Sequence, residues 1–218
     1  MAEDPSPRTS DSAIAVGIID PDEARSDRLA AVLAADPATM VVQVASTLDA
    51  GPLMWSAPEL VILGATGTPA TSAELCRAID DLLPACRVAI ADAAGAEAVS
   101  AITAGAHTQL DSSADARRLS ELMTGTIRGE SEIGAETAAA ILAHLTDPGD
   151  LLQPSAMVTE TEREVLIRLG RGDSYDMVAD AHNVTARLVR LYMGYAVAKH
   201  QRRSREESRT SRPVGVAG

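Results

Sequence analysis

Five short apolar runs alternate with longer amphipathic segments in the first 127 residues of this chain. The runs are AIAVGII (13–19), MVVQVA (40–45), ELVIL (59–63), RVAIA (87–91) and HTQL (107–110). A short, continuous apolar run is typical of a strand that is buried on both faces of a sheet. Strands that alternate with helices form βαβ units, whose crossovers are right-handed. Residues 13–127 therefore predict a flavodoxin-like α/β domain, with a five-stranded parallel sheet and helices on both faces.

The segments outside this alternation carry turn and tail signals. Two turn-rich stretches surround AETAAAILAHL (135–145), so residues 128–157 are predicted to be a linker that contains one short helix. The polar residues 1–12 lack the basic-then-apolar order of a signal peptide and are predicted to be disordered. Residues 201–218 are basic and poor in apolar side chains, and are predicted to be a disordered tail. No apolar run approaches the length of a membrane span, so we expect a cytoplasmic protein without a membrane partner.

Helix signals dominate residues 158–200. Thr159 and Glu162 fit a capping box at the start of a first helix. Ser174 is a good cap for a second helix, and Thr185 caps a third after the tight turn HNV. Two short helices joined by a tight turn have helix-turn-helix spacing, so this part predicts a small all-α domain.

The charge of the chain is divided unevenly. Its formal net charge is −12, but residues 1–150 hold 8 Lys and Arg against 23 Asp and Glu, whereas residues 151–218 hold 11 against 8. The region from Asn183 to Arg205 has six basic residues and no acidic one. Because these charges fall on and just after a predicted helix of an otherwise acidic chain, they favour a polyanionic partner.

The segment VTETEREVLIRLGRGDSYDMVADAHNVTARLV (158–189) resembles a LuxR-type helix-turn-helix. The matching residues are Thr159, the run from Glu162 to Leu166, Gly172, Ser174, Val178, Ala179, Val184, Thr185, Val189 and Lys199. With the preceding α/β domain and linker helix, residues 13–200 resemble a NarL/FixJ-type response regulator. The resemblance implies a receiver domain, a double-stranded promoter DNA partner and a possible homodimer.

Receivers of this family are phosphorylated on an aspartate at the end of the third strand, with Mg²⁺ held by nearby acids. The corresponding positions in this sequence are Asp20, Pro21, Gly64, Asp92 and Ser112, with Asp22 one residue after the second acidic position. Gly64 replaces the phosphoacceptor, and Pro21 and Ser112 replace an acid and a lysine. Aspartyl phosphorylation needs a carboxylate nucleophile and a divalent cation. The resemblance therefore implies an atypical, phosphorylation-independent regulator with no cofactor.

The degenerate pocket has further interpretations. Asp20, Asp22 and Asp92 could hold a cation, although we expect helix caps and solvated carboxylates instead. The loop from Gly64 to Gly67 could cradle an anion, but it lacks the spacing and the lysine of a P-loop. The carboxyl edge of a parallel sheet is where ligands bind, so a small-molecule or protein effector is expected there.

The DNA-binding candidates lie on and after the third predicted helix of the C-terminal domain. They are Arg187, Arg190, Leu191, Gly194, Lys199, Arg202 and Arg203. Arg187 and Arg190 are expected to face outward and reach base edges in a major groove, whereas Lys199 and the later arginines are expected to contact phosphates. Two features depart from the family pattern: Asp176 stands where a basic residue is common, and no apolar fourth helix follows Lys199. The second departure weakens the usual dimer model.

Three functions remain open from the sequence. The first is a DNA-binding transcriptional regulator, controlled by a ligand, a partner or abundance. The second is a regulatory protein–protein interaction module with a vestigial DNA-binding domain, and the third is a ligand sensor. No nucleophile–base constellation indicates an enzyme, and Cys76 and Cys86 are expected to be buried thiols.

Overall fold

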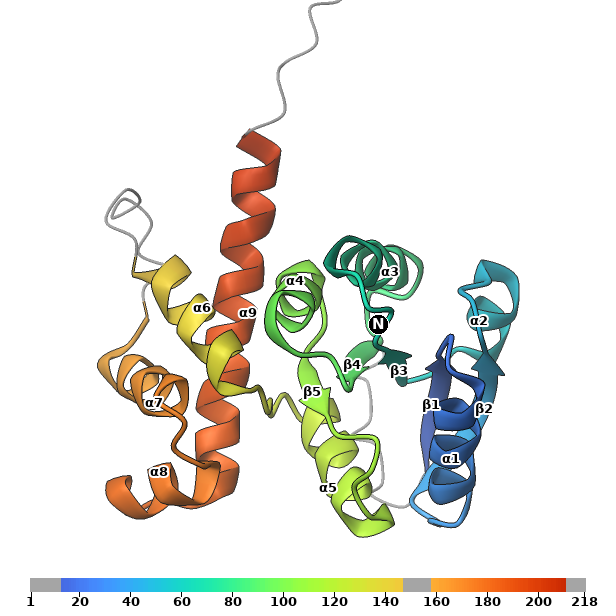
Figure 1. Ribbon diagram of the computed structural model, residues 1–218, viewed down its shortest axis with the longest axis horizontal. Coiled ribbons are helices and arrows are strands. Elements are labelled where there is room, and N and C mark those ends of the chain that lie inside the picture. The colour runs from blue at the N-terminus through green and yellow to red at the C-terminus, as the bar shows by residue number, and fades with distance from the viewer. Residues whose placement is uncertain (1–12, 147–157, 211–218) are drawn as a thin grey trace, which may run out of the picture.

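A parallel sheet forms the centre of the N-terminal domain (Figure 1). The computed structural model describes residues 13–146 and 158–210. The five strands lie in the order β2-β1-β3-β4-β5 and are parallel throughout. They are β1 (Ile14–Ile19), β2 (Thr39–Ala45), β3 (Leu60–Gly64), β4 (Arg87–Ala91) and β5 (Thr108–Leu110). This is the flavodoxin-like order, with its switch point between β1 and β3, so the predicted fold of this domain is confirmed.

Helices cover both faces of the sheet. They are α1 (Glu23–Ala34), α2 (Ala50–Ser56), α3 (Pro69–Leu82), α4 (Gly95–Ala104) and α5 (Ala116–Ile127). Helices α1 and α5 pack together on one face, over a core that includes Ile18 and Leu29. Helices α3 and α4 pack together on the other face, against a second core that includes Leu63 and Ile90. The central strands β1, β3 and β4 are largely apolar because both of their faces are covered, whereas the edge strand β2 leaves Met40 and Val44 exposed.

The C-terminal part of the described chain is helical. Its helices are α6 (Ala135–Leu145), α7 (Glu160–Gly170), α8 (Tyr175–His182) and α9 (Ala186–Thr210). The Thr159 hydroxyl accepts from the Glu162 backbone N–H and the Glu162 carboxylate accepts from the Thr159 N–H, so the predicted capping box is confirmed. Ser174 caps α8, and Asn183 takes a left-handed conformation (φ 53°) in the turn before α9. The predicted helix-turn-helix spacing is therefore present.

Helix α9 is longer than the sequence predicts. The expectation of a disordered tail is wrong for residues 201–210, which continue the helix. Polar contacts replace the missing apolar ones: Gln201 Nε2 donates to the backbone oxygen of Ile102 in α4 (2.8 Å). Arg203 also pairs with Glu207 one turn later (3.0 Å), which supports the helix locally. The predicted disorder of residues 1–12, and of the tail after residue 210, lies outside the described residues.

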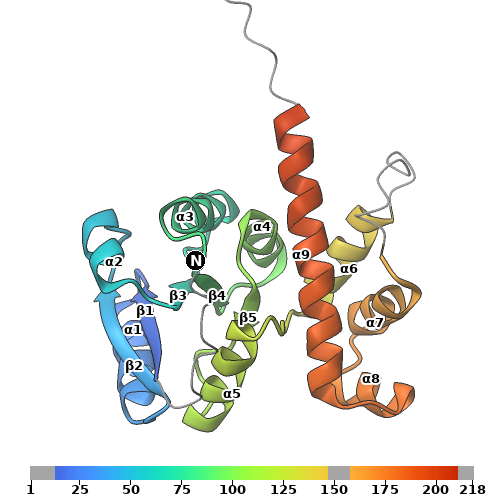
Figure 2. The same cartoon turned by 180° about the vertical axis from the view of Figure 1, so that it is seen from behind.

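One apolar core connects the two domains. It runs from the α3 and α4 face of the sheet, through α6, to α7, α8 and α9, and it includes Ile102, Ile141, Leu166 and Val189. Helix α6, predicted to be part of a linker, packs against both α7 and α4. Both views show α9 running along this junction beside α4 and α6 (Figures 1 and 2). Within the two described ranges, no helix is both long and apolar enough to cross a membrane.

Candidate functional site

Asp20 and Gly64 lie at the carboxyl ends of the neighbouring strands β1 and β3, at the same edge of the sheet. Asp20 follows β1 with a side chain that has no solvent exposure, and Gly64 ends β3. A Cβ atom built on Gly64 would lie less than 3.0 Å from Cγ and from both carboxylate oxygens of Asp20. The Asp20 carboxyl group therefore occupies the space that any side chain at position 64 would need. A glycine at position 64 is therefore a steric requirement of the pocket.

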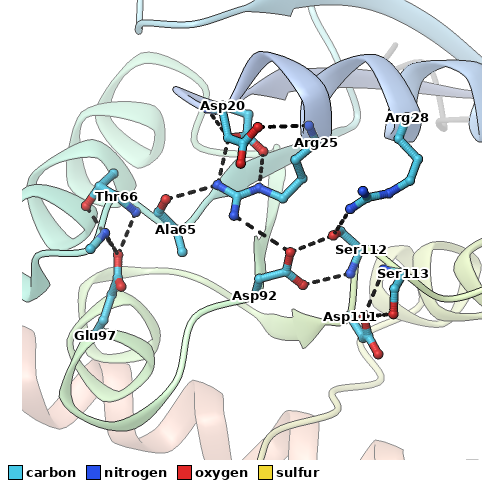
Figure 3. Close-up of polar contacts among 12 residues, drawn as sticks. Asp20, Arg25, Arg28, Ala65, Thr66, Asp92, Glu97, Asp111, Ser112 and Ser113 are labelled. Carbon is cyan, nitrogen blue, oxygen red and sulfur yellow. Dashed lines mark hydrogen bonds and ion pairs between the residues drawn. The ribbon is translucent and has the colours of Figure 1, made fainter.

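Arg25, in the first turn of α1, supplies a cation to this pocket. Its guanidinium donates to both carboxylate oxygens of Asp20, at 2.6 Å and 2.8 Å, and to the backbone oxygen of Ala65 at 3.0 Å (Figure 3). It also lies 3.7 Å from the carboxylate of Asp92. The hydrogen bond to Asp20 raises the pKa of Arg25 above its ordinary value, so the group is permanently charged. A cation that belongs to the chain itself therefore lies between the two acids.

Ser112 follows β5 and anchors Asp92. The Asp92 residue has a left-handed backbone (φ 56°), and its carboxylate accepts from the backbone N–H of Ser112 (2.8 Å) and from the Ser112 hydroxyl (2.5 Å). Arg28 in turn donates to the Ser112 hydroxyl oxygen (2.7 Å). A continuous polar chain therefore runs along the carboxyl edge of the sheet from Asp20 to Arg28.

The residues of this pocket do not fit a divalent cation. The guanidinium of Arg25 already occupies both oxygens of Asp20. Asp22 is the N-cap of α1 and accepts from the Arg25 backbone N–H (3.0 Å), and Pro21 is exposed. The described residues contain no cluster of three or more His, Cys, Asp or Glu side chains that could hold a metal ion. The cation that balances Asp20 and Asp92 is Arg25.

The loop after β3 does cradle an anion, and that anion comes from the chain. One carboxylate oxygen of Glu97, in the first turn of α4, accepts from the backbone N–H groups of Thr66 (2.7 Å) and Gly67 (3.1 Å) and from the Ser72 hydroxyl (2.6 Å). Burial alone would raise the pKa of Glu97, but these hydrogen bonds hold it below its ordinary value. The loop therefore ties α4 to the end of β3 (Figure 3).

The basic start of α9 faces carboxylates of the segment that follows α5. Arg187 Nε lies 2.8 Å from Glu130, and Arg190 pairs with Glu132, which also pairs with Arg118 of α5. Burial alone would raise the pKa of Glu132, but the two arginines hold it below its ordinary value. The expected outward orientation holds only in part: Arg187 keeps 64% of its side chain exposed, but Arg190 keeps 24%.

The same segment lies directly against the backbone of α9. The Ser131 N–H donates to the backbone oxygen of Arg190 (2.9 Å). A Cβ atom on Gly194 would lie less than 3.0 Å from the backbone oxygen of Gly129. The sequence placed Gly194 among the DNA-binding candidates. In the structure, its missing side chain leaves room for this carbonyl group. We call this arrangement, with residues 129–132 against α9, the closed arrangement.

The other DNA-binding candidates have separate environments. Lys199 Nζ lies 2.6 Å from the Glu162 carboxylate of α7. Arg203 is buried and pairs with Glu207, so the expectation that it contacts DNA phosphates is wrong for this arrangement. Leu191 is half-buried and lines a cavity beside residues 129–131, whereas Arg202 is exposed.

The sequence did not identify six charged residues of these two regions. They are Arg25, Arg28, Glu97, Arg118, Glu130 and Glu132. The sequence carried a usable signal for Arg25. A buried acid at the edge of a sheet needs a cation, and Arg25 lies five residues after Asp20, in the first turn of the predicted helix. The pairing of Glu130 and Glu132 with α9 joins residues far apart in sequence, and a single sequence carries no signal for that.

The comparisons with known proteins identify similar structures only. No family model matches the chain, and no curated protein matches it in sequence. A solved response regulator, ChrA of a heme-sensing two-component system, is 21% identical with a TM-score of 0.47, over 91% of this chain and 97% of ChrA. RcsB of Salmonella typhimurium is 13% identical (TM-score 0.46, 86% and 92% covered), and FixJ of B. japonicum is 22% identical (TM-score 0.40, 86% and 90% covered).

Proposed function

We propose that this protein is a DNA-binding transcriptional regulator whose receiver-like domain works without aspartyl phosphorylation. The proposal rests on the start of α9, the second helix of the helix-turn-helix. There Arg187 and Arg190 form ion pairs with Glu130 and Glu132. Carboxylates bind guanidinium groups with the same fork geometry as phosphates do. Glu130 and Glu132 therefore stand where DNA phosphates or base edges would bind, and DNA binding requires that α9 separate from them.

The carboxyl edge of the sheet supports control without phosphorylation. Gly64 offers no nucleophile, and Arg25 already neutralises Asp20. A signal must therefore change the balance between the closed arrangement and an open one by binding one of them better. An effector, a protein partner or the abundance of the chain supplies that signal. A homodimer on DNA through the last turns of α9 also needs opening, because Gln201 and Arg205 contact the N-terminal domain in the closed arrangement.

The burial of two cysteines and one histidine supports a non-enzymatic role. Burial raises the pKa of both Cys76 and Cys86 to about 12, so neither forms a thiolate near neutral pH. Burial also lowers the pKa of His107 to about 4. His107 accepts from the backbone N–H of Val88, so its ring nitrogen is engaged in the core.

Genome-wide recovery of DNA with the tagged full-length protein tests the proposal. The wild type is expected to recover discrete sites, and the variant Arg187→Ala with Arg190→Ala to lose them. The matched control is Arg163→Ala, an exposed arginine on α7 whose partner Glu160 lies on the same helix. Recovery of no discrete site by the wild type, with specific co-purification of a protein instead, contradicts the proposal and favours the interaction module.

A further inference from the structure

A cavity of about 330 Å³ lies at the junction of the two domains. Its walls come from the end of α5, from the connecting segment and from the first turns of α9, and they include Thr124, Arg128, Glu130, Glu132, Arg187 and Arg190. Both ribbon views show α5 on the side of the N-terminal domain that faces α9 (Figures 1 and 2). The volume lies within the usual range for small-molecule sites, about 300–1,000 Å³.

The charges on the cavity walls favour an anionic occupant. Every lining carboxylate is already paired: Glu130 with Arg187, Glu132 with Arg118 and Arg190, and Glu121 with Arg117. Arg128, in contrast, has no acidic partner within residues 13–146 and 158–210, and the Thr124 hydroxyl has no hydrogen-bond partner there. An incoming cation would have to displace an arginine. An incoming anion finds a guanidinium group and a hydroxyl donor without a partner.

These two donors are placed to act together. Thr124 and Arg128 are four residues apart at the end of α5, and the Arg128 N–H donates to the Thr124 backbone oxygen (3.3 Å), so both side chains lie on one face. Arg187 and Arg190 of α9 also line the cavity. An anion in the cavity is therefore within the field of cations from both domains.

We propose that this cavity binds a small organic anion, either a carboxylate or a phosphate monoester, with Arg128 and Thr124 as its main ligands. Because the walls come from both domains, the anion binds the closed arrangement better than an open one. Resting on the proposed DNA-binding function, the anion therefore weakens DNA binding, and DNA weakens binding of the anion by the same factor. This cavity replaces the carboxyl edge of the sheet as the proposed effector site.

Calorimetric titration of the full-length protein with citrate and with glucose 6-phosphate, at constant ionic strength, tests the site. At least one of the two is expected to bind saturably below about 10 mM. Arg128→Gln and Thr124→Leu are each expected to weaken that binding about tenfold or more, by loss of a charge-assisted hydrogen bond or by filling the cavity. The control is Arg77→Gln, an exposed arginine of α3 that does not line the cavity, and it should change the affinity by less than about twofold.

Failure of the site and failure of the proposed function give different results. Absence of saturable binding by both anions, or equal losses in Arg128→Gln and Arg77→Gln, overturns the site. Binding at the site without any change in affinity for a recovered DNA duplex overturns the coupling. If the anion binds as expected but the protein recovers no DNA, the proposed function is wrong and the site stands.

Discussion

Replacement of Arg25 by alanine is expected to cost a large share of the free energy of unfolding. The Asp20 side chain has no solvent exposure and the Arg25 side chain is 14% exposed, so the variant leaves a buried carboxylate without its cation. Removal of one partner from such a pair costs about 3–5 kcal/mol, whereas whole domains are stable by about 5–15 kcal/mol. We expect about 3 kcal/mol, the lower end, because the backbone N–H of Asp22 still donates to the Asp20 carboxylate (2.8 Å).

Urea unfolding of the full chain near neutral pH measures this loss. The matched control is Arg28→Ala, one turn later on α1, which removes one hydrogen bond to Ser112 and should cost about 1 kcal/mol. MgCl₂, compared with NaCl of equal ionic strength, is expected to stabilise Arg25→Ala and not the wild type, because the guanidinium no longer blocks Asp20 and Asp92. A loss for Arg25→Ala no larger than for Arg28→Ala, or an equal effect of Mg²⁺ on wild type and variant, would refute this reasoning.

Three further predictions follow from the same structure. Gly64→Ala places a Cβ in the space of the Asp20 carboxyl group and is expected to cost about 1–3 kcal/mol in urea unfolding, whereas Gly51→Ala, with no atom nearer than 3.5 Å, should cost less than half as much. Incubation with Mg²⁺ and acetyl phosphate is expected to leave the intact mass unchanged, and a hydroxylamine-labile phosphate adduct would contradict the absence of a nucleophile. Stability is expected to fall as pH drops from 6.5 toward 4, because burial lowers the pKa of His107 and of His200 to about 4, and the unfolded chain therefore binds protons first. Each histidine accounts for about 2 kcal/mol of this loss at pH 5. The free energy of unfolding of His200→Gln should therefore drop less between neutral pH and pH 5 than that of the wild type. A wild-type free energy of unfolding that does not change with pH over this range would show the assignment to be wrong.

The sheet could be predicted from the sequence because its strands are buried on both faces. Such strands must be apolar throughout, and the runs ELVIL and RVAIA carry that signal without help from distant residues. The capping box of Thr159 and Glu162 was equally predictable, since both of its hydrogen bonds are local. Elements fixed by local sequence or by burial alone were therefore correctly identified.

Features that depend on pairing between distant residues could not be predicted in the same way. The end of α9 is polar, and what holds it is a hydrogen bond from Gln201 to a backbone group of α4. The lack of a carboxylate at position 64 could be read from the sequence, but the contacts of Arg25 with Ala65 and Asp92 join residues far apart in the chain. The contact between Gly194 and Gly129 depends on the relative placement of two domains, which no local pattern specifies.

The affinity of Gly194→Ala for a recovered DNA duplex tests the central claim most directly. The substitution changes no charge and raises helix propensity, but its Cβ collides with the backbone oxygen of Gly129 in the closed arrangement. A steric cost of about 1–3 kcal/mol should shift the chain toward the open arrangement and tighten DNA binding roughly tenfold in fluorescence anisotropy. Gly51→Ala, far from the junction, should bind as the wild type does. Equal or weaker DNA binding by Gly194→Ala, with helical content unchanged by circular dichroism, would contradict the claim that residues 129–132 hold the DNA-binding helix closed.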